Sequence, residues 1–211
     1  MSDNAPEYHH LILETHAGWA VVRLHRPHAL NTLSIATLEE LTRAFDWLGR
    51  HPDIRAVILT GSGEAFAAGA DIREVAALNG LAALAFAERG QRLCRLIERS
   101  PSLVIAAIDG YCFGGGLDVA MACHLRYASA RSLFAHPGAR IGIMTGFGGT
   151  WRLPQLVGKS RALELFLTGK RLTAQQALAW GLIHRVIAHG SVVEAAKETA
   201  MNIITRSPLT S

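Results

Sequence analysis

The sequence contains few of the residues that mark a secreted, metal-binding or membrane protein. It has three cysteines in 211 residues, an odd number without the spacing of a metal site, which favours a reducing compartment: Cys94, Cys112 and Cys123. The first residues lack a charged segment followed by an apolar core, so we expect no signal peptide. The apolar stretch at 78–87 is interrupted by Asn79 and Gly80 and is too short to span a bilayer. We therefore expect a cytoplasmic protein that does not bind membranes.

Charged residues are also sparse. They make up 18% of the chain, and the formal net charge is only +4, with a pI near 9.3. Because the basic residues are scattered rather than clustered, we expect no nucleic-acid partner. The hydrophobic content of 50% is enough for a sizeable core. We therefore treat residues 1–211 as one domain.

Hydrophobic periodicity indicates alternating strands and helices, which is typical of an α/β fold. The expected strands lie at 10–15 and 19–24, joined as a hairpin, and at 54–60, 103–108, 125–129, 133–135 and 182–187. The expected helices lie from Ser34, a cap, to before Pro52, and at 80–99, from 117 onward, and at 161–167, 173–180 and 192–205. The part from about 159 to 211 is thus predicted to be mainly helical.

The most informative stretch is 110–118, Gly-Tyr-Cys-Phe-Gly-Gly-Gly-Leu-Asp, between a buried strand and an expected helix. Glycines at such a junction let a ligand approach the backbone and leave the first helical amides free to bind an anion. Asp118 is expected one residue into the helix. The simpler interpretation is a glycine-rich turn with an acidic residue that complements the helix dipole.

A second segment has the same organisation. The stretch at 65–73, Ala-Phe-Ala-Ala-Gly-Ala-Asp-Ile-Arg, follows the strand at 54–60 and the turn Gly61-Ser-Gly63. Two loops of small residues, each after a buried strand, would present two sets of free backbone amides. This pairing favours a functional site over an isolated turn.

Together with further motifs, these segments resemble the crotonase superfamily, the enoyl-CoA hydratase and isomerase proteins. The other motifs, weak alone but specific in this order, are Arg26-Pro-His-Ala-Leu-Asn31, Gly148-Gly-Thr-Trp-Arg-Leu-Pro154, Leu167-Thr-Gly169, Thr173-Ala-Gln-Gln-Ala177 and Gly181-Leu182. The resemblance implies an α/β, crotonase-like spiral of ββα units in a single domain. It also implies a homotrimer or a dimer of trimers, and a coenzyme A thioester as substrate without a metal or another cofactor.

The resemblance also assigns site residues. The backbone amides of Ala70 and Gly115 would form an oxyanion hole for the thioester carbonyl, and Asp118 would transfer protons. The implied substrate-binding residues are His28, Ala29, Leu30, Ala68, Gly69, Asp71, Ile72, Phe113, Gly114 and Gly138. Arg26, Arg55 and Arg73 lie near the loops that resemble those binding coenzyme A, although each is more often a surface charge.

The sequence departs from the family pattern at the acid-base groups. Family hydratases use two glutamates, one directly after the glycine turn and one about twenty residues later. The first position is Asp118 here and the second is Gly138, which has no side chain; Gly146 stands where some relatives carry a further aspartate. One carboxylate suffices for a double-bond shift, whereas addition of water normally wants two groups.

Nearby residues leave open alternatives. On an extended strand, His136 would point to the same face as Gly138 and reach the site, although a histidine beside a proline is more often a packing residue. Thr145 is able to hold a water molecule, and Arg140 is more simply a solvent or interface charge. Cys112 is a conceivable nucleophile, but packing is the simpler role because no histidine is near it in sequence.

Two hypotheses of different class follow. The first is an enoyl-CoA hydratase or isomerase that stabilises an enolate in acyl-CoA, and so fatty-acid or related, metabolism. The second is an acyl-CoA-binding homologue with little catalysis, which is supported by Gly138 and by a sequence that ends soon after Pro208, where the family continues into further helices. We therefore expect the C-terminal helices to be shortened or missing. A third hypothesis, in which the glycine turn binds a nucleotide phosphate, has little support because neither phosphate-binding glycine motif occurs.

Overall fold

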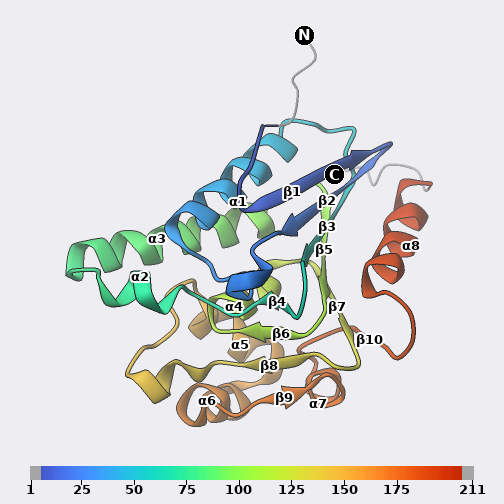
Figure 1. Ribbon diagram of the computed structural model, residues 1–211. Helices are drawn as coiled ribbons and strands as arrows, with labels where there is room; N and C mark the ends of the chain where they lie inside the picture. Colours follow the sequence, from blue (N-terminus) through green and yellow to red (C-terminus); the bar gives the residue numbers. More distant parts are fainter. Residues whose placement is uncertain (1–5, 206–211) are drawn as a thin grey trace.

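The computed structural model describes residues 6–205 and contains two β-sheets surrounded by helices (Figure 1). The strands are β1 Leu11–His16, β2 Trp19–Leu24, β3 Ala56–Gly61, β4 Ala65–Ala67, β5 Leu103–Ile108, β6 Tyr111–Phe113, β7 Leu125–Ser129, β8 Leu133–Ala135, β9 Leu172–Thr173 and β10 Arg185–Ile187. The α-helices are α1 Ile35–Leu48, α2 Ile72–Ala76, α3 Gly80–Glu98, α4 Gly115–Ala122, α5 Gly149–Val157, α6 Lys159–Thr168, α7 Ala174–Ala179 and α8 Val192–Ile204. Two 3-10 turns, η1 Pro27–Ala29 and η2 Pro137–Ile141, complete the list.

The larger sheet has the order β1-β2-β3-β5-β7-β10, and all its neighbours are parallel except the β1–β2 hairpin. Its central strands are buried on both faces. In β3, Val57 and Leu59 belong to the main core, while Ala56 and Ile58 belong to a second core under α8. This explains why these strands are continuous apolar runs without alternation.

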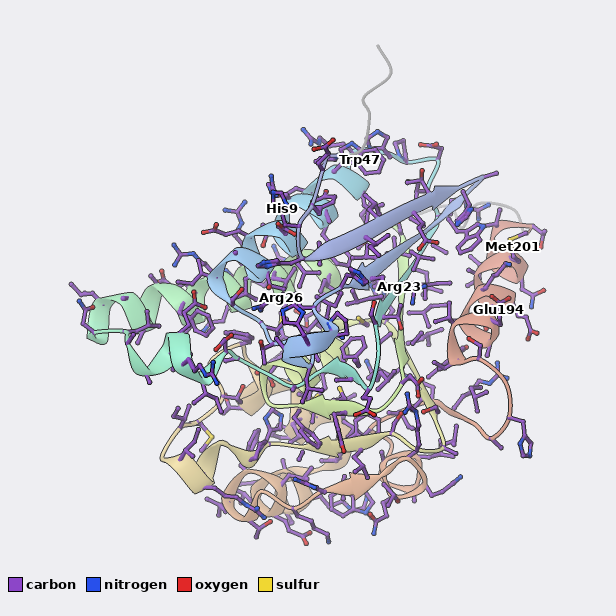
Figure 2. All side chains as sticks on the ribbon, in the orientation of Figure 1. His9, Arg23, Arg26, Trp47, Glu194 and Met201 are labelled. Atoms are coloured by element: carbon purple, nitrogen blue, oxygen red, sulfur yellow. The ribbon has the colours of Figure 1, made fainter. Side chains whose placement is uncertain are left out.

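Helix α8 covers the outer face of this sheet, on the right in Figure 1. It buries Val192, Ala196 and Ala200 against the strands. Its opposite face carries Glu194 and Met201, which are exposed and labelled in Figure 2. Among the described helices, none is both long enough and apolar enough to cross a membrane.

The smaller sheet has the order β4-β6-β8-β9. The pairs β3 and β4, β5 and β6, and β7 and β8 each place one strand in the larger sheet and the next in the smaller sheet, and successive pairs lie side by side. This repetition is the predicted spiral of ββα units. It brings the loops after β4 and β6 together at one edge.

The glycine turn between β6 and α4 is explained by two constraints. Gly114, which precedes the helix, has a φ of 51°, in the region that favours glycine. A Cβ on Gly116 would lie 2.3 Å from the carbonyl oxygen of Ala67. Because α4 begins at Gly115, Asp118 is its fourth residue, and the predicted position one residue into the helix was wrong.

Most of the other predicted elements are confirmed, including the hairpin, the Ser34 cap of α1 and the helix α3. Helix α5 was missed, because it starts at a glycine and contains Pro154. The predicted strand at 182–187 is shorter and begins at Arg185. Within the part predicted to be mainly helical from 159 onward, α6, α7 and α8 are present, together with the short strands β9 and β10.

Candidate active site

The two loops predicted to supply backbone donors meet. Ala70 follows β4 and Gly115 follows β6, and these strands are parallel neighbours. A Cβ on Gly115 would lie 3.7 Å from the amide nitrogen of Ala70. Within residues 6–205, neither amide donates a hydrogen bond to another residue. Two adjacent unengaged amides are the arrangement that an oxyanion hole requires.

A pocket of about 450 Å³ adjoins these amides. Seven of the predicted site residues line it: Ala68, Gly69, Ala70, Ile72, Gly114, Gly115 and Gly138. The rest of its wall is mainly apolar and includes Val75, Leu78, Phe86, Ile143, Met144, Phe147 and Phe166. An apolar pocket beside two free amides suits an acyl chain whose carbonyl oxygen points at the amides.

Three predicted substrate-binding residues lie in the loop around η1, outside the pocket wall. His28 and Leu30 are exposed, and Ala29 is half-buried. The carbonyl oxygen of Leu30 accepts a hydrogen bond from the amide of Ala68, 3.0 Å away. This loop therefore braces the Ala68–Asp71 segment, and contact of its side chains with substrate stays a prediction.

Asp71 and Phe113 have structural partners. The Asp71 carboxylate caps α2 by accepting from the Arg73 amide, and it also accepts from the Thr32 hydroxyl. Phe113 ends β6 beneath the guanidinium of Arg171, which lies 5.6 Å from its ring centroid. Both residues flank the amide loops without lining the pocket.

The three arginines considered for coenzyme A contacts lie apart. Arg26, labelled in Figure 2, donates to the carbonyl oxygen of Thr32. Arg55 donates to the carbonyl oxygen of Ile204 at the end of α8, and Arg73 is exposed on α2. Of the three, Arg26 and Arg73 are therefore in the neighbourhood of the amide loops.

Asp118 is completely buried and does not line the pocket. The Thr145 hydroxyl donates to its Oδ2. Burial raises the pKa of Asp118 to about 7, against the opposing effects of the Thr145 hydroxyl, the Arg152 charge and the backbone amides of Phe147 and Gly149. A carboxyl group with this pKa exchanges protons readily at neutral pH. The Thr145 hydroxyl, which the sequence suggested as a group that holds water, instead donates a hydrogen bond to this carboxyl group.

The backbone around the carboxyl group is held by Arg152. Its guanidinium donates to both carboxylate oxygens of Glu98 on α3, at 2.5 and 2.8 Å, and to the carbonyl oxygen of Phe147 at 2.9 Å. This half-buried ion pair ties α5 to α3 and fixes the segment from Thr145 to Gly149. A Cβ on Gly149 would lie 2.0 Å from Asp118 Oδ1, so glycine makes room for the carboxyl group.

His136 contacts the carboxyl group. It is 3% exposed, lines the pocket, and places Nε2 3.4 Å from Asp118 Oδ1. Burial lowers its pKa to about 3, so the imidazole is neutral at pH 7. The predicted extended strand through His136 and Gly138 is wrong, because β8 ends at Ala135 and a 3-10 turn begins at Pro137.

Gly138 leaves no room for a second acid-base side chain. A Cβ there would lie 2.3 Å from the carbonyl oxygen of Ile143, whose amide donates to the Gly138 carbonyl oxygen. Within the described part of the chain, the pocket wall contains no carboxylate, and Arg140, exposed as predicted, is its one charged side chain. Gly146, at the position of the further aspartate, accepts from the Gln91 side chain through its carbonyl oxygen.

Cys112 is buried, and burial raises its pKa far above the ordinary value. The thiol is therefore protonated at neutral pH, which supports packing over nucleophilic chemistry. Across residues 6–205, no group of three or more histidine, cysteine or acidic residues is arranged to bind a metal ion.

Comparison with known proteins identifies the family of this chain. The family model described as Enoyl-CoA hydratase/isomerase matches residues 14–211. The chain is 39% identical to the short-chain-enoyl-CoA hydratase of Clostridium acetobutylicum and 37% identical to the crotonyl-CoA hydratase of Syntrophomonas wolfei, in each case over 96% of this chain and 78% of the relative. The crystal structure of enoyl-CoA hydratase from Bacillus anthracis superposes with a TM-score of 0.90 at 35% identity, over 95% of this chain and 78% of that one.

Proposed function

Because this chain belongs to the enoyl-CoA hydratase/isomerase family, we propose that it catalyses the addition of water to a 2-enoyl-CoA thioester. The single observation that carries the proposal is the pair of unengaged amides of Ala70 and Gly115 beside an apolar pocket. Attack of water at the β-carbon moves negative charge onto the thioester oxygen, and two fixed donors stabilise that charge. The buried Asp118 carboxyl group supplies acid-base capacity next to the pocket.

Short acyl chains are the natural first substrates. The pocket volume of about 450 Å³ is modest, and the two relatives compared by sequence are named short-chain-enoyl-CoA and crotonyl-CoA hydratases. The walls that limit the chain come from α2, α3 and the segment at 139–147. Residues on these walls, rather than on the amide loops, would select chain length.

The test is hydration of crotonyl-CoA, followed by the loss of absorbance of the conjugated thioester, for the wild type and for Asp118→Asn. We expect clear wild-type activity and a loss of about 100-fold or more in the variant, the usual contribution of a general acid-base group. A wild type that binds the thioester without turning it over would contradict the proposal. It would instead support the acyl-CoA-binding homologue.

A double-bond shift is the second candidate, and Gly138 favours it because only one carboxyl group serves the site. A single group is able to move one proton between neighbouring carbons of the acyl chain. Incubation with 3-butenoyl-CoA distinguishes the two reactions, since an isomerase forms the conjugated thioester and its absorbance rises.

We also propose that the chain assembles as a homotrimer or a dimer of trimers. Trp151 on α5 and Leu163 and Leu167 on α6 support this, because they are large apolar side chains with 63%, 47% and 66% exposure. A cytoplasmic location, a role in fatty-acid metabolism and chemistry without a metal or other cofactor stay predictions from the sequence.

A further inference from the structure

The carboxyl group expected to perform the chemistry is not the group that faces the substrate. Asp118 has no exposed surface and is absent from the pocket wall. Two side chains that line the pocket also contact Asp118: Thr145, whose hydroxyl donates to Oδ2, and His136. Of these two, only the imidazole is able to take up a proton at one ring nitrogen while it releases a proton from the other.

The contact between His136 and Asp118 leaves one polar atom on each side without another partner. Imidazole Nε2 and carboxyl Oδ1 are 3.4 Å apart, both are fully buried, and neither has a hydrogen-bond partner elsewhere among the described residues. Buried polar atoms without partners are costly unless they share a proton with each other. The two groups therefore fit each other as donor and acceptor.

The second imidazole nitrogen is placed differently. Within residues 6–205, Nδ1 of His136 has no hydrogen-bond partner, and it is not among the fully buried unpartnered atoms. Since His136 lines the pocket, Nδ1 is the ring nitrogen that a bound molecule is able to reach. The ring is held between the pocket and Phe166, whose centroid is 4.8 Å away.

We propose that His136 is the catalytic residue that exchanges protons with the acyl chain and its water molecule, and that Asp118 acts through it. The inference deepens the hydratase function proposed above and rests on it. It gives the site two acid-base groups although Gly138 has no side chain.

The proton movements balance over one cycle. Nδ1 takes a proton from water as the water oxygen bonds to the β-carbon, and the π electrons move to the thioester oxygen as an enolate held by Ala70 and Gly115. At the same time Nε2 passes its proton to Asp118 Oδ1, so that the imidazole stays neutral. In the second half, Asp118 returns its proton to Nε2, Nδ1 gives its own to the α-carbon, and the enolate collapses to the saturated thioester.

His136 and Asp118 together are also able to act as the single acid-base group that a double-bond shift needs. Nδ1 would remove a proton from one carbon and return it to another, while the carboxyl group holds the negative charge before and after. In both reactions the pair takes up one proton and later returns it, so its total charge changes by one during the cycle.

The experiment compares His136→Gln with the wild type in hydration of crotonyl-CoA. Glutamine keeps a polar side chain at the position but has no ring nitrogen to accept a proton. We expect kcat to fall about 100-fold or more, with little change in the dissociation constant for the substrate analogue butyryl-CoA. The matched control is His189→Gln, at an exposed histidine in the loop before α8.

A variant that keeps kcat within threefold of the wild type, or that loses only affinity, would overturn the role of His136 while leaving the hydratase function intact. An inactive wild type would refute the proposed function, and this role with it. If His136→Gln does not fold, nitrogen-15 NMR of the wild type and of Asp118→Asn decides. The Nε2 resonance of His136 should shift between the two, and an unchanged resonance would refute the pair.

Discussion

At the residue scale, the surroundings of Asp118 and His136 reverse the order in which the two side chains lose a proton as pH rises. The histidine loses its proton first, and the aspartate second. The ordinary pKa values are 3.8 for an aspartate and 6.5 for a histidine, whereas here they are about 7 and about 3. Burial is the main cause in both cases, because it disfavours the charged form of each group. Between about pH 4 and pH 6.5, Asp118 and His136 together hold one titrating proton in both the folded and the unfolded state. That proton is on the Asp118 carboxyl group in the folded state and on the His136 imidazole in the unfolded state.

This reversal predicts opposite effects on stability when one partner is removed. The raised pKa of Asp118 lowers stability as pH rises from about 4 to about 7, because the folded state holds more protons than the unfolded state. The lowered pKa of His136 raises stability as pH rises from about 3 to about 6.5, because the unfolded state holds more. In the wild type the two effects largely cancel.

We therefore expect His136→Gln to lose stability between pH 5 and pH 7 relative to the wild type, and Asp118→Asn to gain it over the same interval. Urea unfolding of the three proteins at both pH values measures this, since the other titrating groups are common to all. Equal pH dependence in the three proteins would show that the pair does not hold the proton as described.

The pH dependence of catalysis is a separate prediction. Around Asp118 lie the Thr145 hydroxyl, the Arg152 cation with its partner Glu98, the His136 imidazole, and the thiols of Cys94 and Cys112, which burial keeps protonated. The carboxyl group must be ionised to take the proton from Nε2. We expect kcat/KM to decrease about tenfold per pH unit below about pH 7. A rate independent of pH from 5 to 8 would contradict this.

Single residues also show how far the site could be predicted from the sequence. The closeness of the Ala70 and Gly115 loops was predictable, because each loop follows a strand in a recognisable motif, whereas the catalytic action of Ala70, Gly115 and Asp118 stays a prediction. That His136 reaches the site was one alternative that the sequence left open, but its contact with Asp118 was not predicted. It depends on how residues 136–145 leave β8, which alternating strand periodicity does not describe.

At the scale of elements, α3 offers a matched pair of glycines. A Cβ on Gly90 would lie 2.0 Å from the ring of Phe147, whereas a Cβ on Gly80 has no atom within 4 Å. Phe147 lines the pocket, and its ring lies 2.7 Å from where a Cβ on Gly115 would stand. A displaced ring therefore crowds the oxyanion hole.

We expect Gly90→Ala to lower the free energy of unfolding by about 1–3 kcal/mol, as overpacking of a core does. The melting temperature and kcat should both fall. Gly80→Ala should be neutral or stabilising by up to about 1 kcal/mol, because alanine is the better helix former. Thermal unfolding and crotonyl-CoA turnover of both variants check this. Equal effects of the two substitutions would mean that the Phe147 ring moves aside freely.

The same scale shows why helix α5 was missed while α1 and α3 were found. Helices α1 and α3 have side-chain caps, from Ser34 and Asn79, and long amphipathic faces. Helix α5 begins after Gly148 without a side-chain cap and contains Pro154, so its local signals oppose a helix. Its start is instead stabilised by tertiary contacts, through Arg152, Glu98 and Phe147.

At the scale of the whole molecule, the exposed apolar side chains of α5 and α6 predict self-association. Leu163 and Leu167 are one helical turn apart and therefore share a face of α6. We expect the double variant Leu163→Glu and Leu167→Glu to be a monomer, and the wild type and Met201→Glu, on α8, to be trimers or hexamers. Light scattering after gel filtration measures the masses. A monomeric wild type would contradict the proposed assembly.

The spiral of ββα units fixes the distance between the amides of Ala70 and Gly115, which no single loop controls. The two amides proposed to polarise the thioester come from consecutive turns of the spiral, at the ends of parallel neighbours, so their separation follows the distance between strands β4 and β6. The other walls of the pocket, in contrast, are formed mainly by α2, α3 and the connection from β8 to α5. Activation of the carbonyl therefore depends on the spacing of the strands, whereas the choice of the acyl chain depends on the helices and the connection that form the other walls. Replacement of the segment at 139–144 should therefore change which thioesters this protein accepts without changing how strongly the two amides stabilise the enolate.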